Sequence, residues 1–337
     1  MLRLSVLDQS VAIQGRPHDD SIRETLAMAE LCESLGYHRF WVSEHHSHDT
    51  IVGTAPEILM AAIAARTRSI RIGSAGVMLP HYSALKVAEQ FRVLEALAPG
   101  RIDLGVGRAP GSDSRTAQAL NPFGTMRTLQ FPEQVRDLIA WVTGDDLPDI
   151  HPFRQVRAFP AGETAPEVWM LGSSDYGAQV AAHFGLPYSF AYFITDGAGT
   201  EQALAIYREL YRPSPRHPKP VANICLWALV AESDEEAQRL FTSRAKWRVA
   251  RDRGVLAPID HPDAPLPFDL TPQEEARIAE MRRTAFVGTP SAVGARLREL
   301  ASRLGLDEIV VLTWSHDPAA RRRSYELLAA ELALKCA

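Results

Sequence analysis

Short apolar runs alternate along this chain with longer stretches in which apolar residues recur at helical spacing. The first run is LRLSVLD at 2–8, and in the stretch 19–36 Ile22, Leu26 and Ala29 repeat every three or four residues, which predicts a helix ending at Gly36. Similar runs predict seven further strands, at 39–44, 70–79, 101–107, 167–172, 187–193, 222–230 and 307–314. Helices are predicted after them near 55–66, 84–97, 127–143, 175–184, 200–211, 233–251 and 317–335.

The eight strand–helix units predict an α/β fold with a parallel sheet. Near-continuous apolar strands are typical of a sheet buried on both faces, because right-handed crossovers place the helices outside it. Eight units favour a closed barrel of the TIM (β/α)8 type, with a doubly wound open sheet as the alternative. Two stretches interrupt the rhythm: a surface insertion at about 144–166, and a lid or extension at about 252–306 that carries two helical segments around FVGTP, between the seventh and eighth units. We expect one domain over residues 1–337.

Composition narrows the class of partner. Hydrophobic residues make up 46% of the chain and charged residues 23%, with a formal net charge of −5, which are values typical of a globular protein. Mixed charges offer no basic face for nucleic acid, and no apolar run approaches the ~20 residues that span a bilayer. The three cysteines are scattered, which argues against a disulfide framework. We therefore expect a cytoplasmic protein that acts on small molecules.

The sequence WVSEHHSHD at 41–49 places a glutamate and three histidines after the second predicted strand. In a barrel, functional groups gather at the carboxyl ends of the strands. Alternation along the strand would direct Glu44 and His46 to one side and His45 to the other. A metal site would use His46 and His48, as in a metal-dependent barrel hydrolase, but few further ligands follow the other strands. Acid/base chemistry and a structural corner remain the other two interpretations.

Small residues interrupt the third strand in IGSAGVMLPHYS at 72–83. Ala75 and Gly76 would let a flat ring press against bare backbone. A β-bulge or a close contact between strands explains the same pattern equally well.

An anion site is predicted where the fourth and fifth strands end. Arg108 lies among glycines in GVGRAPGSD at 105–113, and Gly172, Ser173 and Ser174 precede a helix in LGSSDYGAQVAA at 171–182. Hydroxyls and free backbone N–H groups at the helix start, with a guanidinium opposite, would hold a phosphate. Simple N-capping by Ser173 or Ser174 is the alternative.

Several segments, taken in order, resemble the bacterial luciferase-like flavin monooxygenases. They are WVSEHH, RIGSAGVMLP, ALKVAEQFRVLEALAPGRIDLGVGRAPGSD, LGSSDYGAQVAAHFGLP and FVGTP, and the resemblance covers nearly the whole chain. The resemblance is strongest to the non-luminescent, single-chain members. The resemblance implies a TIM barrel that holds reduced FMN (FMNH2) at its carboxyl face, dioxygen as co-substrate, and a separate flavin reductase as the source of the reduced flavin.

The resemblance also implies roles for individual residues. His45 matches the family's catalytic histidine, which assists proton transfer around the flavin. Ala75 and Gly76 match a small pair behind the flavin ring, where the family often has a non-prolyl cis peptide. Arg108, Ser173 and Ser174 match the positions that hold the flavin phosphate. Gly107 stands where the light-emitting enzymes carry a cysteine, and Ser173 where they carry an acid, which argues against luminescence.

The resulting hypothesis is a flavin-dependent monooxygenase that oxidises a small organic substrate such as an aldehyde. The alternatives are a deazaflavin-dependent hydride-transfer enzyme, the metal-dependent hydrolase, and a flavin-binding protein without turnover. Family resemblance further suggests a homodimer formed through the helices after the second and third strands, where Ala61, Ala62, Ala64 and Ala65 offer a surface of small residues.

Overall fold

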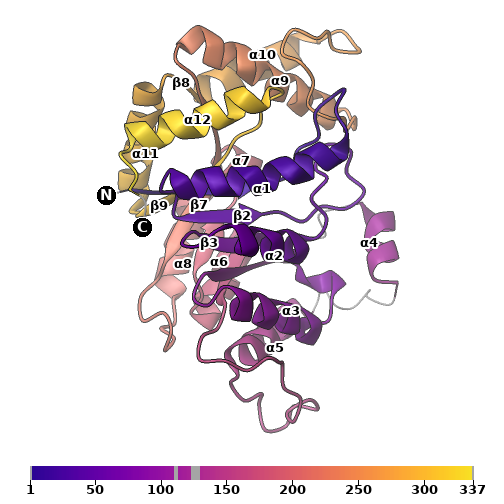
Figure 1. Cartoon of the computed structure of the whole chain (residues 1–337), viewed down its shortest axis with the longest axis vertical. Helices are drawn as coiled ribbons and strands as arrows, with labels where there is room; N and C mark the ends of the chain where they lie inside the picture. Colours follow the sequence, from indigo (N-terminus) through magenta and orange to yellow (C-terminus); the bar gives the residue numbers. More distant parts are fainter. Residues whose placement is uncertain (1, 110–112, 123–129, 336–337) are drawn as a thin grey trace.

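A closed parallel barrel forms the centre of the protein in the computed structural model, which describes residues 2–109, 113–122 and 130–335 (Figure 1). Eight strands pair in sequence order, and the last pairs with both the first and the seventh. The predicted TIM barrel is therefore confirmed, and the open sheet is excluded. The barrel strands are β1 (Arg3–Asp8), β2 (Arg39–Val42), β3 (Arg71–Met78), β4 (Ile102–Gly107), β5 (Glu167–Gly172), β6 (Tyr188–Phe190), β7 (Ala222–Val230) and β9 (Glu308–Leu312).

Helices connect successive strands on the outside of the barrel. Those predicted from the sequence are α1 (His18–Ser34), α2 (Pro56–Arg66), α3 (Ala84–Leu97), α5 (Phe131–Thr143), α6 (Asp175–Phe184), α8 (Thr200–Leu210), α9 (Asp234–Asp252) and α12 (Pro318–Glu331). The first residues predicted for the helix at 127–143 lie outside the described part of the chain. Three short elements were not predicted, because each is under two turns or lies within a loop: the 3-10 turn η1 (Leu79–His81), α4 (Ser114–Leu120) and α7 (Tyr192–Thr195).

The predicted extension between the last two barrel strands contains two helices and one further strand. They are α10 (Pro272–Thr284), β8 (Phe286–Gly288) and α11 (Pro290–Leu304). The sequence predicted the two helical segments but not β8, which pairs in parallel with the end of β7 outside the closed barrel. In Figure 1, α10 and β8 lie with α9 above the barrel, and α12 runs beside α1.

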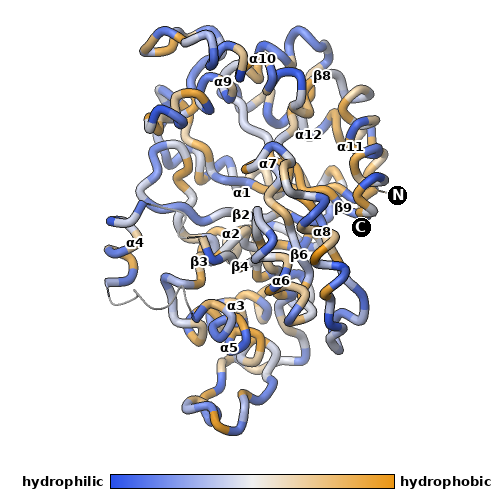
Figure 2. Tube along the Cα trace, turned by 180° about the vertical axis from the view of Figure 1, so that it is seen from behind, coloured by the Kyte–Doolittle hydropathy of each residue, from blue (hydrophilic) through white to orange (hydrophobic). Residues whose placement is uncertain are grey.

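The core is formed by the strands and by one face of each surrounding helix. In α11, for example, Val293, Leu297, Leu300 and Leu304 are buried at helical spacing. The trace of this helix accordingly alternates between hydrophobic and hydrophilic residues (Figure 2). In the described part of the chain, no helix combines the length and the apolar character needed to cross a membrane.

Ion pairs close the amino end of the barrel. Arg39 donates to Glu308, to Asp103 and to Glu167 at 2.9, 2.9 and 3.0 Å. Trp41 Nε1 also donates to Asp103, at 2.9 Å. Burial opposes ionisation of Asp103, but Arg39 and a second guanidinium outweigh it and lower the pKa of this carboxyl. The charged network fills this end, and a cavity lies at the opposite, carboxyl end.

The predicted surface insertion is a loop that an arginine anchors. Residues 144–166, all of them described, form no helix or strand and hang below α5 in Figure 1. The Arg92 side chain on α3 donates to the carbonyl oxygens of Pro160 at 2.8 Å, Thr164 at 2.9 Å and Val142 at 3.1 Å. The loop therefore packs at the side of the barrel, away from the strand ends that hold the candidate site.

Candidate active site

A cavity of about 520 Å³ lies at the carboxyl ends of the barrel strands. All seven residues that the sequence suggested for the site line it: His45, Ala75, Gly76, Arg108, Gly172, Ser173 and Ser174. Four tryptophans contribute to its walls, namely Trp41, Trp227, Trp247 and Trp314. A space of this size, largely apolar with a few convergent polar groups, has the properties of a small-molecule site.

The residues predicted to form an anion site all line this cavity. The guanidinium of Arg108 lies over the ring of Tyr176, in the first turn of α6, at 4.0 Å from the ring centre. Arg108 makes no hydrogen bond or ion pair with the described residues. The loop residues 110–112 that follow it lie outside the described part of the chain.

Ser174 is the N-cap residue of α6, yet its side chain forms no capping hydrogen bond. Simple N-capping, the alternative raised from the sequence, therefore does not explain the serine at position 174. The first-turn N–H groups and the Ser174 hydroxyl have no hydrogen-bond partner among the described residues and lie at the positive end of the helix dipole. Gly172 packs closely behind them, since a Cβ there would lie 3.3 Å from Gly177 Cα.

Close packing between strands explains the small residues of β3. The pairing of β3 with β4 shifts at Ala75–Val77, which is a β-bulge, and the Ala75–Gly76 peptide is cis. A Cβ on Gly76 would lie 2.8 Å from the carbonyl oxygen of Gly105 and would collide with the Leu171 side chain. A close contact between strands, which is the structural alternative raised from the sequence, is thus present. The same residues line the cavity, so a role in ligand binding stays a prediction.

The residues of the histidine cluster make separate contacts with the rest of the protein. His46 Nε2 lies 2.8 Å from Glu44, and the Tyr82 hydroxyl donates to the same carboxylate at 2.6 Å. His48 Nδ1 accepts from the backbone N–H groups of Thr50 and Ile51, both at 3.1 Å. His46 and His48 are therefore engaged in different contacts. Among the described residues no group of three or more His, Cys, Asp or Glu side chains is placed to hold a metal ion.

His45 lies outside the contacts of Glu44 with His46 and Tyr82 and faces the cavity, with its ring centre 5.7 Å from that of His48. Its backbone N–H donates to Gly53, while its Nδ1 atom is buried without a hydrogen-bond partner among the described residues. Burial, followed by the proximity of His48 and His46, lowers the pKa of His45 to about 4. The imidazole is consequently neutral at pH 7, with a ring nitrogen able to accept a proton.

Helix α9 contributes cavity residues that sequence reasoning missed. Arg244, Arg248 and Arg251 all line the cavity, together with Trp247. The signal was present in the sequence, because spacings of four and three place these arginines on one helix face. A charged helix is usually exposed, and only the packing of α9 over the barrel directs this face inward.

Comparisons with a family profile and with known sequences identify the family of this chain. The profile of the family described as luciferase-like monooxygenase matches residues 3–308. The chain belongs to this family. It is thus a flavin-dependent oxidoreductase, as the resemblance predicted. The luciferase-like chain is 42% identical over 329 residues to the uncharacterized protein YwcH of Bacillus subtilis, with 97% of this chain and 98% of that protein covered. It is 37% identical over 340 residues to an N-acetyl-S-alkylcysteine monooxygenase of the same organism, with 97% of each covered.

Solved structures share the whole fold of this luciferase-like protein. The crystal structure of apo-MsnO8 superimposes with a TM-score of 0.87 at 34% identity, covering 99% of both chains. More distant is the oxygenating constituent of 3,6-diketocamphane monooxygenase from Pseudomonas putida, solved in complex with FMN, at a TM-score of 0.70 and 20% identity over 100% of this chain and 99% of that one. An F420-dependent secondary alcohol dehydrogenase has a TM-score of 0.68 at 14% identity, covering 98% and 99%. At these lower identities the likeness shows the fold alone.

Proposed function

We propose that this protein is a monooxygenase that uses reduced FMN and dioxygen to oxidise a small organic substrate. The observation that supports the proposal is that Arg108, stacked on Tyr176 in the first turn of α6, lines the same cavity as Ser173, Ser174 and His45. An anionic tail and a flat apolar ring are the two features that such a site would select.

The phosphate of FMN would be held by Arg108, Ser173, Ser174 and the first-turn N–H groups of α6. These groups fit a phosphate because none of the Arg108 donors is engaged with described residues and the Ser174 hydroxyl does not cap its own helix. Ala75 and Gly76 would leave room for the ring on the β3 side. When bound, reduced FMN supplies the two electrons with which one oxygen atom of dioxygen enters the substrate and the other leaves as water.

The protein would control water and protons around this chemistry. Four tryptophans and the apolar strand ends line the cavity and would limit the access of water to a bound flavin, which would strengthen electrostatic interactions there. His45 is neutral because burial disfavours its charged form. A ring nitrogen of His45 is thus able to accept a proton at the cavity wall and to return it. We infer that His45 acts in this way as the acid/base residue.

Titration of the purified chain with reduced FMN and with reduced F420, under anaerobic conditions, tests the choice of cofactor. Quenching of tryptophan fluorescence reports binding, since four tryptophans line the cavity. We expect FMN to bind more tightly than F420, and Arg108→Gln to weaken FMN binding at least tenfold. The matched control is Arg322→Gln, which changes an exposed arginine on α12 outside the cavity. Tighter binding of F420, together with hydride transfer from an alcohol to oxidised F420 in a separate assay, would support the deazaflavin alternative instead.

Turnover separates the enzyme from a flavin-binding protein without activity. We expect oxygen consumption coupled to product formation when a flavin reductase, supplied as a separate protein, provides reduced FMN, with aldehydes as one substrate class to test. His45→Ala should keep FMN affinity but lose most product formation. A large loss of FMN affinity in this variant would contradict the acid/base role.

We infer a homodimer that buries apolar side chains of the adjacent helices α2 and α3. Ile58 on α2 is 68% exposed, and Val93 and Leu97 on α3 are 49% and 60% exposed. Of the alanines on α2, Ala64 is buried in the core while Ala65 is exposed, so the small-residue surface is only partly available. Sedimentation velocity should give a dimer that Leu97→Glu dissociates. A monomeric wild-type protein would refute this inference.

A further inference from the structure

Arginines of α9 form a second cationic group in the cavity, separate in sequence from the anion site at Arg108. Arg244 and Arg248 are 6% and 5% exposed, and both line the cavity with the half-buried Arg251. Arg108 follows β4, whereas α9 follows β7, with β5 and β6 between these strands in the barrel. Buried guanidinium groups are normally paired with carboxylates, because an unpaired charge is unfavourable away from water.

The pairing of these arginines is incomplete. Arg248 donates to the Asp196 carboxylate at 3.2 Å and to the Ile194 carbonyl at 3.3 Å, but its buried Nε has no partner among the described residues. Arg251 donates to Asp252 at 2.9 Å. Arg244 makes neither a hydrogen bond nor an ion pair with any described residue.

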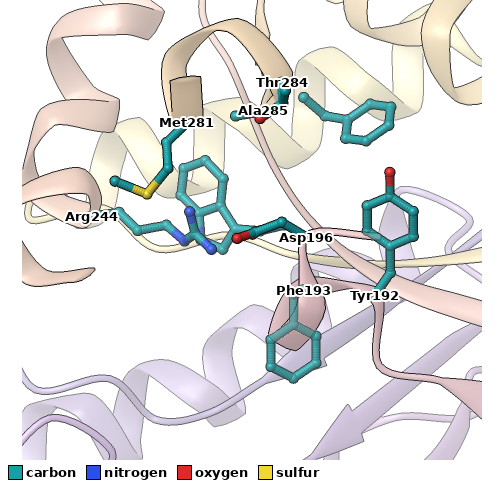
Figure 3. A pocket seen from close by; sticks show the side chains of 9 residues that line it. Tyr192, Phe193, Asp196, Arg244, Met281, Thr284 and Ala285 are labelled. Atoms are coloured by element: carbon teal, nitrogen blue, oxygen red, sulfur yellow. The ribbon is translucent and has the colours of Figure 1, made fainter. Parts of the chain in front are cut away.

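Arg244 also lines a small pocket of about 40 Å³ that adjoins the cavity, where mostly apolar side chains and the Asp196 carboxylate lie around it. Its guanidinium carbon lies 4.5 Å from the ring centre of Trp227. In Figure 3 the side chain extends toward Asp196, with Met281 above it and Phe193 below. An aromatic face and a thioether stabilise a cation only weakly compared with a carboxylate.

Acidic groups do not balance these charges. Among the described residues that line the cavity or the small pocket, the acidic ones are Glu44 and Asp196. Glu44 already accepts hydrogen bonds from Tyr82 and Met78 and contacts His46, while Asp196 pairs with Arg248. Burial, followed by the nearby Arg248, lowers the pKa of Arg244 to about 9. The α9 end of the cavity thus carries an excess of positive charge.

We propose that Arg244 and Arg248 bind a carboxylate of the substrate. The inference rests on the proposed function, in which the FMN phosphate occupies the Arg108 end and leaves the α9 end for the substrate. A carboxylate suits this place because a guanidinium offers two parallel donors to its two oxygens. The Trp227, Phe193 and Met281 side chains would contact the apolar body of the same molecule. The substrate class is therefore a small organic acid with an apolar portion.

Calorimetric titration of the flavin-free full chain tests the proposal without depending on turnover. The probes are benzoate, octanoate and N-acetyl-S-benzylcysteine, each compared with its uncharged primary amide. We expect at least one acid to bind tenfold or more tightly than its amide, and Arg244→Gln and Arg248→Gln to weaken that binding tenfold or more. Arg322→Gln, on the outer surface, should leave it unchanged. Equal binding of acids and amides, no binding of any acid, or full affinity in both variants would overturn the proposal.

Two further measurements separate this proposal from other roles of the arginines. Titration of both variants with FMN should give wild-type affinity; a tenfold loss would assign α9 to the cofactor phosphate and overturn the substrate assignment. Failure of the wild-type chain to bind FMN would refute the proposed function, whereas acid binding is measured without flavin.

Thermal unfolding of the ligand-free protein tests a purely structural role. Because Arg244 lacks a partner, Arg244→Met should unfold at the wild-type temperature or above, as expected for a binding residue held at the expense of stability. A marked fall in melting temperature would instead assign Arg244 to the support of the fold. Should Arg244→Gln fail to fold, Arg244→Lys, which keeps the charge but not the planar fork, provides the binding comparison, with weaker acid binding expected.

Discussion

The guanidinium of Arg108 stacks on the ring of Tyr176, with 4.0 Å between the guanidinium carbon and the ring centre. Tyr176 lies two residues after Ser174 in the first turn of α6, so one short segment supplies both a platform for the arginine and the turn that faces it. Stacking of this kind restricts an exposed arginine before any ligand arrives. A restricted side chain loses less conformational entropy when it binds an anion.

We therefore expect Tyr176→Leu to weaken FMN binding, although Tyr176 need not contact the phosphate. Loss of a stacking contact of about 0.5–2 kcal/mol corresponds to a roughly two- to thirtyfold rise in Kd. Tyr176→Phe keeps the ring and should bind FMN like the wild type. Fluorescence titration of the three proteins provides the measurement, and equal affinities for all of them would remove Tyr176 from the site.

Two glycines of β4 should respond oppositely to substitution. A Cβ on Gly107 would meet nothing within 4 Å, and this residue lines the cavity. Gly107→Val should therefore fold with near wild-type stability but bind FMN at least tenfold more weakly, since the side chain would fill space at the proposed ring site. Circular dichroism melting and flavin titration distinguish the two effects, and unchanged flavin affinity would place the ring elsewhere.

Gly105 is the matched position two residues earlier in the same strand. A Cβ there would collide with the Ser74 carbonyl oxygen and lie 3.1 Å from the Leu171 side chain. Because these neighbours belong to barrel strands that have little freedom to move, Gly105→Ala should lower the free energy of unfolding by roughly 1–3 kcal/mol or more. Urea denaturation measures this change. A stable Gly105→Ala variant would show that β3 and β4 separate more easily than their packing indicates.

The sequence predicted the barrel well because strand–helix alternation is a local property. Strands such as 222–230 and helices such as 84–97 are bounded by their own residues, and their limits agree with the structure. The FVG strand at 286–288 could not be predicted, because its three residues become a strand only by pairing with the end of β7. The sixth strand was predicted too long because α7 begins at Tyr192, within the apolar run.

The residues of the candidate site also differ in whether they could be predicted from the sequence. Residues that directly follow strands, such as His45 and Arg108, could be selected from the sequence because parallel strands end at a common edge. Arg244 and Arg248 could not, since the inward face of α9 depends on how the helix packs above the barrel. The resemblance to known enzymes did not supply them either, as it concerned the cofactor more than the substrate.

The buried ion pairs at the amino end should contribute to stability without affecting the site. Asp103 accepts from Arg39 and Trp41, both at 2.9 Å, and is completely buried. Asp103→Asn would leave Arg39 with a reduced set of acceptors, and breaking such a pair costs about 3–5 kcal/mol. We expect a loss near the lower limit, because Glu308 and Glu167 still accept from Arg39. Urea denaturation measures the loss.

Flavin affinity and pH dependence complete the test of Asp103. The folded pKa of Asp103 is lowered, so its stabilising effect is present above the unfolded pKa of about 3.9 and disappears as pH falls through the lower folded value. Asp103→Asn should remove this part of the acid sensitivity while FMN affinity stays unchanged, since the network lies at the opposite end of the barrel. A large change in flavin affinity would show that the two ends are coupled.

His45 should make the protein less stable in mild acid. Its folded pKa is about 4, below the unfolded value of about 6.5, so the unfolded chain binds more protons between these values. Stability should thus fall as pH decreases from about 6.5 to about 4, with about 1–2 kcal/mol lost between pH 7 and pH 5. In His45→Asn this contribution disappears, and the difference between the two urea denaturation series measures it. NMR titration should show the His45 ring still neutral at pH 5.5; a midpoint near 6.5 would mean that the imidazole is solvated and that burial does not lower its pKa.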